Sequence, residues 1–175
     1  MLKSVDRREE MCTTSSDFVA ELGIPFLAHR LRRLSELFVD DYACWLPEVG
    51  VTAPPRSLST LLLLGELKDA GVTELATKLR LTHPLMIKMV AALAKVGFVT
   101  LHSDPQDGRR RPVRLTRKGE AEIERIEFAI RIMTAAYNEL FRETGASLMD
   151  DVIRVEEAQL RDPFRCRLTR LAAYA

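Results

Sequence analysis

The spacing of apolar side chains from residue 25 onward predicts a chain built mainly of helices. After Pro25, apolar residues recur every three or four positions, as they do on one face of a helix, and this pattern ends at Pro47. A second helix is expected from Thr52, as its N-cap, to about Ala70, and its leucines predict a central place in the core. A third, short helix is expected over residues 73–79.

The stretch from residue 81 to residue 118 predicts a helix followed by a two-stranded hairpin. Helical spacing predicts that one face of the helix is buried, with the residues Leu85, Met89, Ala92, Leu93 and Val96. Residues 98–101 and 113–115 are predicted strands, and residues 103–112 between them contain turn residues and three successive arginines. Together with the short helix before it, this arrangement predicts a helix-turn-helix with a basic wing, which can address both grooves of DNA.

Beyond the hairpin, the pattern predicts a long helix from a cap at Thr116 to about Phe141, followed by tail helices after Ser147 and Pro163. The long helix has a heptad-like rhythm of apolar residues: Ile123, Ile126, Ile130, Met133, Tyr137 and Leu140. This apolar surface exceeds what one small winged domain must cover. We therefore expect a homodimer with two-fold symmetry.

Composition supports a single globular unit. The chain has 175 residues, of which 47% are hydrophobic and 29% are charged, and its formal net charge is +1. The positive charge is local, because residues 103–118 hold six basic residues against two acidic ones. This local excess of positive charge falls on the predicted wing and favours a nucleic-acid partner.

Several function classes are excluded by what the sequence lacks. Cys12, Cys44 and Cys166 have no metal-ligand spacing and suit a reducing cytoplasm, so we expect no metal and no cofactor. No leader and no apolar run long enough for a bilayer is present, so we expect no membrane anchor. The three histidines belong to separate elements and no phosphate loop or nucleophile elbow is found, which argues against an enzyme.

The chain resembles the MarR family of winged helix-turn-helix regulators from about Leu22 onward. The motifs that carry the likeness are Gly50-Val51-Thr52, Glu74-Leu75-Ala76 with Leu79, Leu93 with Gly97-Phe98-Val99, and above all Asp104-Pro105-Gln106-Asp107-Gly108-Arg109-Arg110 followed by Val113-Arg114-Leu115-Thr116 and Gly119. The resemblance implies a mainly α fold with a small β-hairpin wing and long dimerisation helices at both ends of the chain. It implies one MarR-like domain over residues 1–175, with dimerisation helices over 22–50 and 120–175 and the winged helix-turn-helix over 52–118.

The expected function is that of a sequence-specific transcriptional regulator, most simply a ligand-responsive repressor that binds a palindromic operator in double-stranded DNA as a homodimer. The residues expected to contact DNA are His83, Pro84, Ile87 and Lys88 on the recognition helix and Arg109, Arg110 and Arg111 on the wing. The chain departs from the family at Ile87 and Lys88, where a Ser or Thr followed by Arg is usual. Ala91 and Ala94 are also apolar. We therefore expect few direct hydrogen bonds to bases, and we expect specificity to depend more on wing contacts and on DNA shape.

The family resemblance also implies a pocket for a small aromatic or acidic effector. Candidate residues are Phe26, His29, Arg30, Arg33 and Trp45, which supply aromatic walls and a guanidinium able to grip a carboxylate. Two alternatives remain open. One is redox sensing through Cys12 or Cys44, although Cys44 is expected to pack in an apolar helix. The other is a winged-helix adaptor that contacts only proteins, which the apolar recognition helix keeps open.

Overall fold

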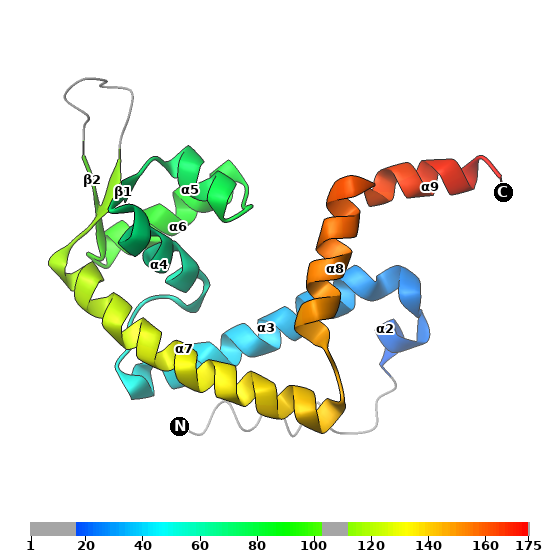
Figure 1. Cartoon of the computed structure of the whole chain (residues 1–175), viewed down its shortest axis with the longest axis horizontal. Coiled ribbons are helices and arrows are strands. Elements are labelled where there is room, and N and C mark those ends of the chain that lie inside the picture. Colours follow the sequence, from blue (N-terminus) through cyan, green and yellow to red (C-terminus); the bar gives the residue numbers. More distant parts are fainter. Residues whose placement is uncertain (1–16, 103–111, 175) are drawn as a thin grey trace. The chain divides into compact units, whose positions relative to one another are not determined.

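The structure is a computed structural model that describes residues 17–102 and 112–174. The chain forms two compact units, and the boundary between them falls after Arg125. The helices of the first unit are α2 (Phe18–Glu21), α3 (Leu27–Trp45), α4 (Leu58–Leu67), α5 (Val72–Lys78), α6 (His83–Lys95) and the start of α7 (Arg117–Thr144) (Figure 1). Short 3-10 turns at Ile24–Phe26, Leu46–Val49 and Pro55–Ser57 connect some of them.

A three-stranded antiparallel sheet completes the first unit. It consists of β1 (Asp69–Ala70), β2 (Val99–Leu101) and β3 (Val113–Leu115), with β3 in the centre. Strands β2 and β3 are the predicted hairpin and pair Thr100 with Arg114. The sequence pattern does not predict β1, because it extends the preceding helix to Ala70, whereas that helix ends at Leu67.

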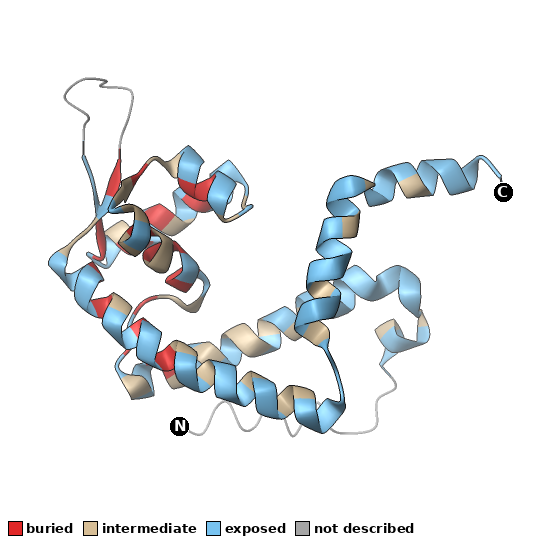
Figure 2. Ribbon diagram, in the orientation of Figure 1, coloured by how far each residue is buried: buried red, intermediate tan, exposed pale blue. Residues whose placement is uncertain are grey.

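The core of the first unit lies where α4, α5, α6 and the sheet meet, since α6 packs against α5 and β2 while α4 packs against β3. Its most deeply buried apolar side chains are Leu61, Leu64, Leu75, Met86, Val90, Leu93, Phe98, Val99 and Val113. They are among the buried residues, which are coloured red in Figure 2. The mainly α architecture with a small β-hairpin wing is therefore confirmed.

The predicted buried face of α6 was wrong in part. Leu85 and Val96 are 42% and 39% exposed, and Ala92 is exposed as well. The helix instead buries Met86 and Val90, together with Leu93, which the prediction did include. The helix is apolar on more than one side, so two sets of apolar residues had the spacing of a buried helix face. Packing against α5 and β2 determines which of the two sets is buried.

The expected N-cap role of Thr52 was also wrong. The helix α4 begins at Leu58 after the 3-10 turn Pro55–Ser57, and Ser57 takes the N-cap position. The Ser57 hydroxyl donates to the carbonyl of Pro54 at 2.7 Å. Two successive prolines hold the backbone before the helix, and the Thr52 hydroxyl contacts a carboxylate on α7 instead.

The second unit holds the rest of α7 together with α8 (Leu148–Arg161) and α9 (Phe164–Ala172). Tyr137 and Phe141 stack on α7 with ring centroids 5.7 Å apart. Between the tail helices, the backbone N–H of Phe164 donates to the side-chain oxygen of Gln159, and Arg170 pairs with Asp162. Both tail helices are exposed over most of their surface (Figure 2). None of the helices within the described ranges is long and apolar enough to cross a membrane.

Candidate nucleic-acid interface

The turn between α5 and α6 sets the position of the recognition helix. Ala76 on α5 is buried and small, which allows close approach of the two helices. Arg80 adopts a left-handed backbone (φ 52°), and the N–H of Leu81 then donates to the carbonyl of Ala76 at 2.9 Å. Thr82 occupies the N-cap position of α6, but its side chain makes no capping hydrogen bond.

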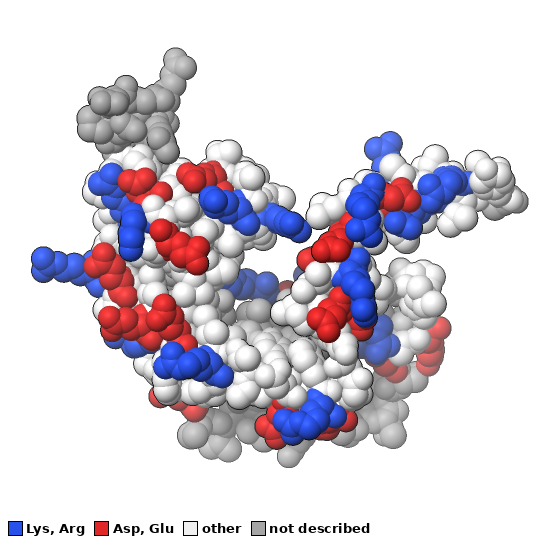
Figure 3. All heavy atoms as spheres, viewed as in Figure 1, with Lys and Arg blue, Asp and Glu red and all other residues white. Residues whose placement is uncertain are grey.

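The predicted DNA contacts of α6 all lie on its exposed surface. His83, Pro84 and Lys88 are exposed, and the side chain of Ile87 is 47% exposed. Across the described residues, no ion pair engages Lys88 or His83, so their polar atoms are available to an anionic partner. On the face shown in Figure 3, acidic and basic side chains are intermixed over the winged helix, so positive potential there must come from local groups rather than from one broad patch.

A groove of about 1070 Å³ runs beside α6. It is bounded by residues along the whole length of α5, by one side of α6 and by the end of β2. The predicted contact residues His83 and Ile87 line it, whereas Lys88 does not. The groove is therefore a continuation of the recognition surface toward the wing.

At the base of the wing, Arg114 from the basic stretch 103–118 forms an ion pair within the chain. Arg114 on β3 donates to the carboxylate of Asp69 on β1 at 3.0 Å, and both side chains are about half exposed. This pair joins the outer strand to the central one. The arginines expected at the wing tip, Arg109, Arg110 and Arg111, lie outside the described residues.

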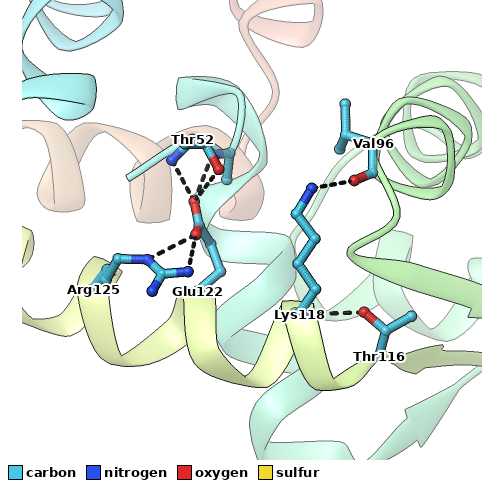
Figure 4. A network of polar contacts seen from close by, with 8 residues as sticks. Thr52, Val96, Thr116, Lys118, Glu122 and Arg125 are labelled. Carbon is cyan, nitrogen blue, oxygen red and sulfur yellow. Dashed lines mark hydrogen bonds and ion pairs between the residues drawn. The ribbon is translucent and has the colours of Figure 1, made fainter. Parts of the chain in front are cut away.

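The junction of the wing with α7 is fixed by Thr116, Lys118 and Gly119. The Thr116 hydroxyl donates to the carbonyl of Gly97 at 2.7 Å and accepts from the N–H of Gly119 at 3.1 Å, so the predicted cap at Thr116 is confirmed. Lys118 donates to the carbonyl of Val96 at 2.7 Å (Figure 4) and also lies over the ring of Phe98. Lys118 thus satisfies a carbonyl at the C-terminal end of the recognition helix.

A buried carboxylate holds the chain before α4. Glu122 on α7 is fully buried, and its Oε1 accepts hydrogen bonds from the backbone N–H groups of Thr52 and Ala53, the latter at 2.7 Å. The Thr52 hydroxyl contacts the same oxygen, and Arg125 pairs with Oε2 at 3.0 Å (Figure 4). Two backbone donors and a guanidinium thus compensate the buried charge. Sequence reasoning missed Glu122, because its partners lie 69 and 70 residues away.

The candidate ligand residues fall into two separate places on α3. Phe26, His29, Arg30 and Arg33 lie near its start, whereas Trp45 is its last residue, roughly 28 Å farther along the helix axis. The structure therefore does not bring Trp45 together with Phe26 within one chain. Phe26, His29 and Arg30 are exposed.

Arg33 is engaged by a carboxylate of its own chain. Its Nη1 and Nη2 donate to the two oxygens of Asp17 at 3.1 and 2.5 Å, in the forked geometry that guanidinium groups favour. The hydrogen bond from Arg33, with a smaller contribution from Arg30, lowers the pKa of Asp17 from 3.8 to about 2. In this structure, the carboxylate bound at the start of α3 belongs to Asp17 of the same chain.

The cysteines and histidines form no metal centre within the described residues. Cys44 and Cys166 are free and exposed, so the packing expected for Cys44 is not seen in the single chain, and Cys12 lies outside the described residues. In residues 17–102 and 112–174, no group of His, Cys, Asp and Glu is placed to hold a metal ion. His102 contacts the Thr100 hydroxyl at 2.7 Å instead.

Comparison with known proteins identifies the winged part. Residues 54–110 match the model of the MarR family. No curated protein matches the chain. Among solved structures, a probable transcriptional regulator from Pseudomonas aeruginosa is 25% identical with a TM-score of 0.56, and the match covers 77% of this chain and 96% of that one.

Two further solved structures hold bound partners. The transcriptional repressor CouR, bound to a 23-mer DNA duplex, is 28% identical with a TM-score of 0.59, over 74% of this chain and 92% of that one. The PcaV transcriptional regulator from Streptomyces coelicolor, in complex with its natural ligand, is 25% identical with a TM-score of 0.55, over 78% and 92%. The family resemblance drawn from the sequence is thereby confirmed, and these neighbours are transcriptional regulators.

Proposed function

We propose that this chain is a transcriptional repressor that binds a two-fold symmetric operator in double-stranded DNA as a homodimer, because residues 54–110 match the model of the MarR family. The observation that carries the proposal is the exposed surface of α6, where His83, Pro84, Ile87 and Lys88 face outward from a buried Met86–Val90–Leu93 stripe. A recognition helix placed in this way fits the major groove. The DNA-bound CouR structure supports the same use of the fold.

The wing supplies the second part of the interface. Strands β2 and β3 are held to α6 and α7 by Thr116 and Lys118, so the segment between them starts from a fixed base. Arg109, Arg110 and Arg111 in that segment provide charge for phosphates and for the minor groove. Arg114 is paired with Asp69 and has a structural role at the wing base.

Dimerisation is proposed through the terminal helices. The tail helix α9 exposes a stripe of Phe164, Leu168 and Leu171, and each of these side chains is more than half exposed in the single chain. At the other end, Phe18 and Ile24 are also exposed. Apolar surface of this extent favours association with a second copy. Two subunits would place their recognition helices about one DNA turn, roughly 34 Å, apart.

An effector is proposed at the start of α3. Arg33 already binds a carboxylate in forked geometry, and Arg30 adds positive charge nearby. An aromatic acid would compete with Asp17 for Arg33, and binding would change the separation of the recognition helices. A thermal-shift screen with aromatic acids tests this. Stabilisation that disappears in Arg33→Gln but persists in Arg32→Gln supports the site, and no stabilisation by any acid contradicts it.

The proposed function is tested by selecting bound fragments from a pool of random duplexes. A repressor of this type enriches a motif with two-fold symmetry and half-sites about one turn apart. A protein-only adaptor would enrich no sequence. The selection therefore decides between the two classes, because a random pool includes half-sites of every sequence.

A further inference from the structure

The groove beside α6 has an apolar floor. The side chains that form it come from α5, α6 and β2 and are Val72, Ile87, Val90, Ala91 and Leu101. Val90 belongs to the core and is 2% exposed, whereas Ile87 and Leu101 are 47% and 45% exposed. Two large apolar side chains are thus left partly in water at the surface that the proposed function places against DNA.

One of the polar groups of the groove is already engaged within the chain. The Thr77 hydroxyl donates to the carbonyl of Thr73 at 2.9 Å, so its proton is already committed. The remaining polar side chains that line the groove are Thr73, Glu74, Lys78 and His83. Of these, Lys78 and His83 suit phosphate oxygens. The part of α6 that lines the floor, Ile87 to Ala91, is apolar toward the groove.

The chemistry of the major groove indicates what such a floor recognises. Each base pair presents hydrogen-bonding groups there, but thymine also presents its C5-methyl group, which is the apolar feature of the unmodified groove. A surface with apolar side chains in the centre and cationic groups nearby matches a methyl group between two phosphate backbones. The positive charges of Lys78 and Lys88 and the DNA-bound neighbour favour this occupant over an apolar peptide.

We propose that the groove formed by Ile87, Ala91 and Leu101 reads the C5-methyl group of a thymine in each operator half-site. This inference rests on the proposed function and names the feature that the recognition helix reads. Burial of one methyl group in the complex strengthens the association constant for DNA by about fourfold. In a symmetric operator with one such thymine in each half-site, the two contacts together give about fifteenfold.

The test compares thymine with uracil, which differ only in this methyl group. A duplex selected from the random pool is synthesised with deoxyuridine in place of thymidine, one symmetric pair of positions at a time, and dissociation constants are measured by fluorescence anisotropy. At one pair of positions, wild-type protein should lose about fifteenfold in affinity. In Ile87→Ala, the thymine and uracil duplexes should bind with nearly equal affinity, because the side chain that contacts the methyl group is gone. Ile87 is half exposed, so this variant should fold.

Lys88→Ala is the matched control on the same helix. Lys88 is exposed and does not line the groove, so its loss should weaken binding to the thymine and uracil duplexes equally. Sequence-specific binding that is indifferent to uracil at every position would overturn the inference and leave the proposed function intact. The same holds if Ile87→Ala retains the full preference for thymine. Absence of any enriched sequence would refute both proposals.

Discussion

The carboxylate of Glu122 accepts a hydrogen bond from the backbone N–H of Ala53 at 2.7 Å, across 69 residues of sequence. Through this bond and the one from Thr52, the first turns of α7 hold the segment that leads into α4. The helix that supports the wing and the helix at the centre of the winged core are therefore tied together by one buried side chain.

Replacing Glu122 should destabilise the first unit. Glu122→Ala leaves two backbone N–H groups without their acceptor, and we expect a loss of about 3 kcal/mol in the free energy of unfolding. Glu122→Gln keeps one acceptor oxygen and should lose less. Chemical denaturation measures both, with Glu124→Ala as the control, because Glu124 is exposed on the same helix. Equal stability of Glu122→Ala and Glu124→Ala would contradict this role.

Gly119 should tolerate no side chain. A Cβ atom at this position would lie 2.2 Å from the carbonyl oxygen of Phe98, which is backbone and cannot rotate away. Gly119→Ala should therefore cost about 2 kcal/mol of stability and displace the wing base. Gly71→Ala is the control, since its Cβ would meet nothing within 4 Å. Thermal unfolding of the two variants compares them, and a Gly119→Ala protein as stable as Gly71→Ala would refute the close approach.

The pair between Asp17 and Arg33 should be visible in a pH titration. The pKa of Asp17 lies at about 2, below its ordinary value of 3.8, because Arg33 donates to the ionised form. The stabilisation from this pair is thus present above about pH 4 and is lost as the pH falls toward 2. In Arg33→Gln, NMR titration of the Asp17 carboxyl should show its pKa return toward 3.8. Arg32→Gln should leave it low, and the opposite pattern would contradict the pairing.

Charge reversal on the wing should act on every DNA sequence alike. Arg109→Glu combined with Arg110→Glu removes phosphate contacts, so affinity should fall for specific and random duplexes. The slope of log K against log salt should flatten by about one unit for each lost contact. Arg154→Glu combined with Arg161→Glu on α8 serves as the control, because it changes the net charge by the same amount at two exposed positions. Binding and slope that match the control would remove these arginines from the interface.

Local sequence determines some elements of this fold, and tertiary packing determines others. The helix from residue 27 to residue 45, the strands β2 and β3 and the cap at Thr116 were predictable, because periodicity and local turn chemistry specify them. The buried face of α6 was not, because that helix is apolar on several sides and only its packing against α5 and β2 distinguishes Met86 from Leu85.

Long-range polar partners were also beyond prediction. Asp69 and Arg114 are paired across 45 residues, and nothing in either local sequence indicates the other. Glu122 lies among other acidic residues of α7 and is fully buried. Its burial depends on the segment before α4, which is distant in the sequence. Lys118 belongs to the basic stretch that predicted DNA contact, yet its amine is directed to Val96. Tertiary structure thus engages two basic residues of that stretch, Arg114 and Lys118, within the chain, and neither was among the residues expected to contact DNA.

The central claim is that this winged helix recognises a specific double-stranded sequence. The most direct measurement is fluorescence anisotropy of the wild-type protein with the selected duplex and with a scrambled duplex of equal length, over a series of salt concentrations. The account predicts binding to the selected duplex that is tighter by about a thousandfold or more, and a marked loss of affinity with salt for both. Equal affinity for the two duplexes at every salt concentration would contradict it.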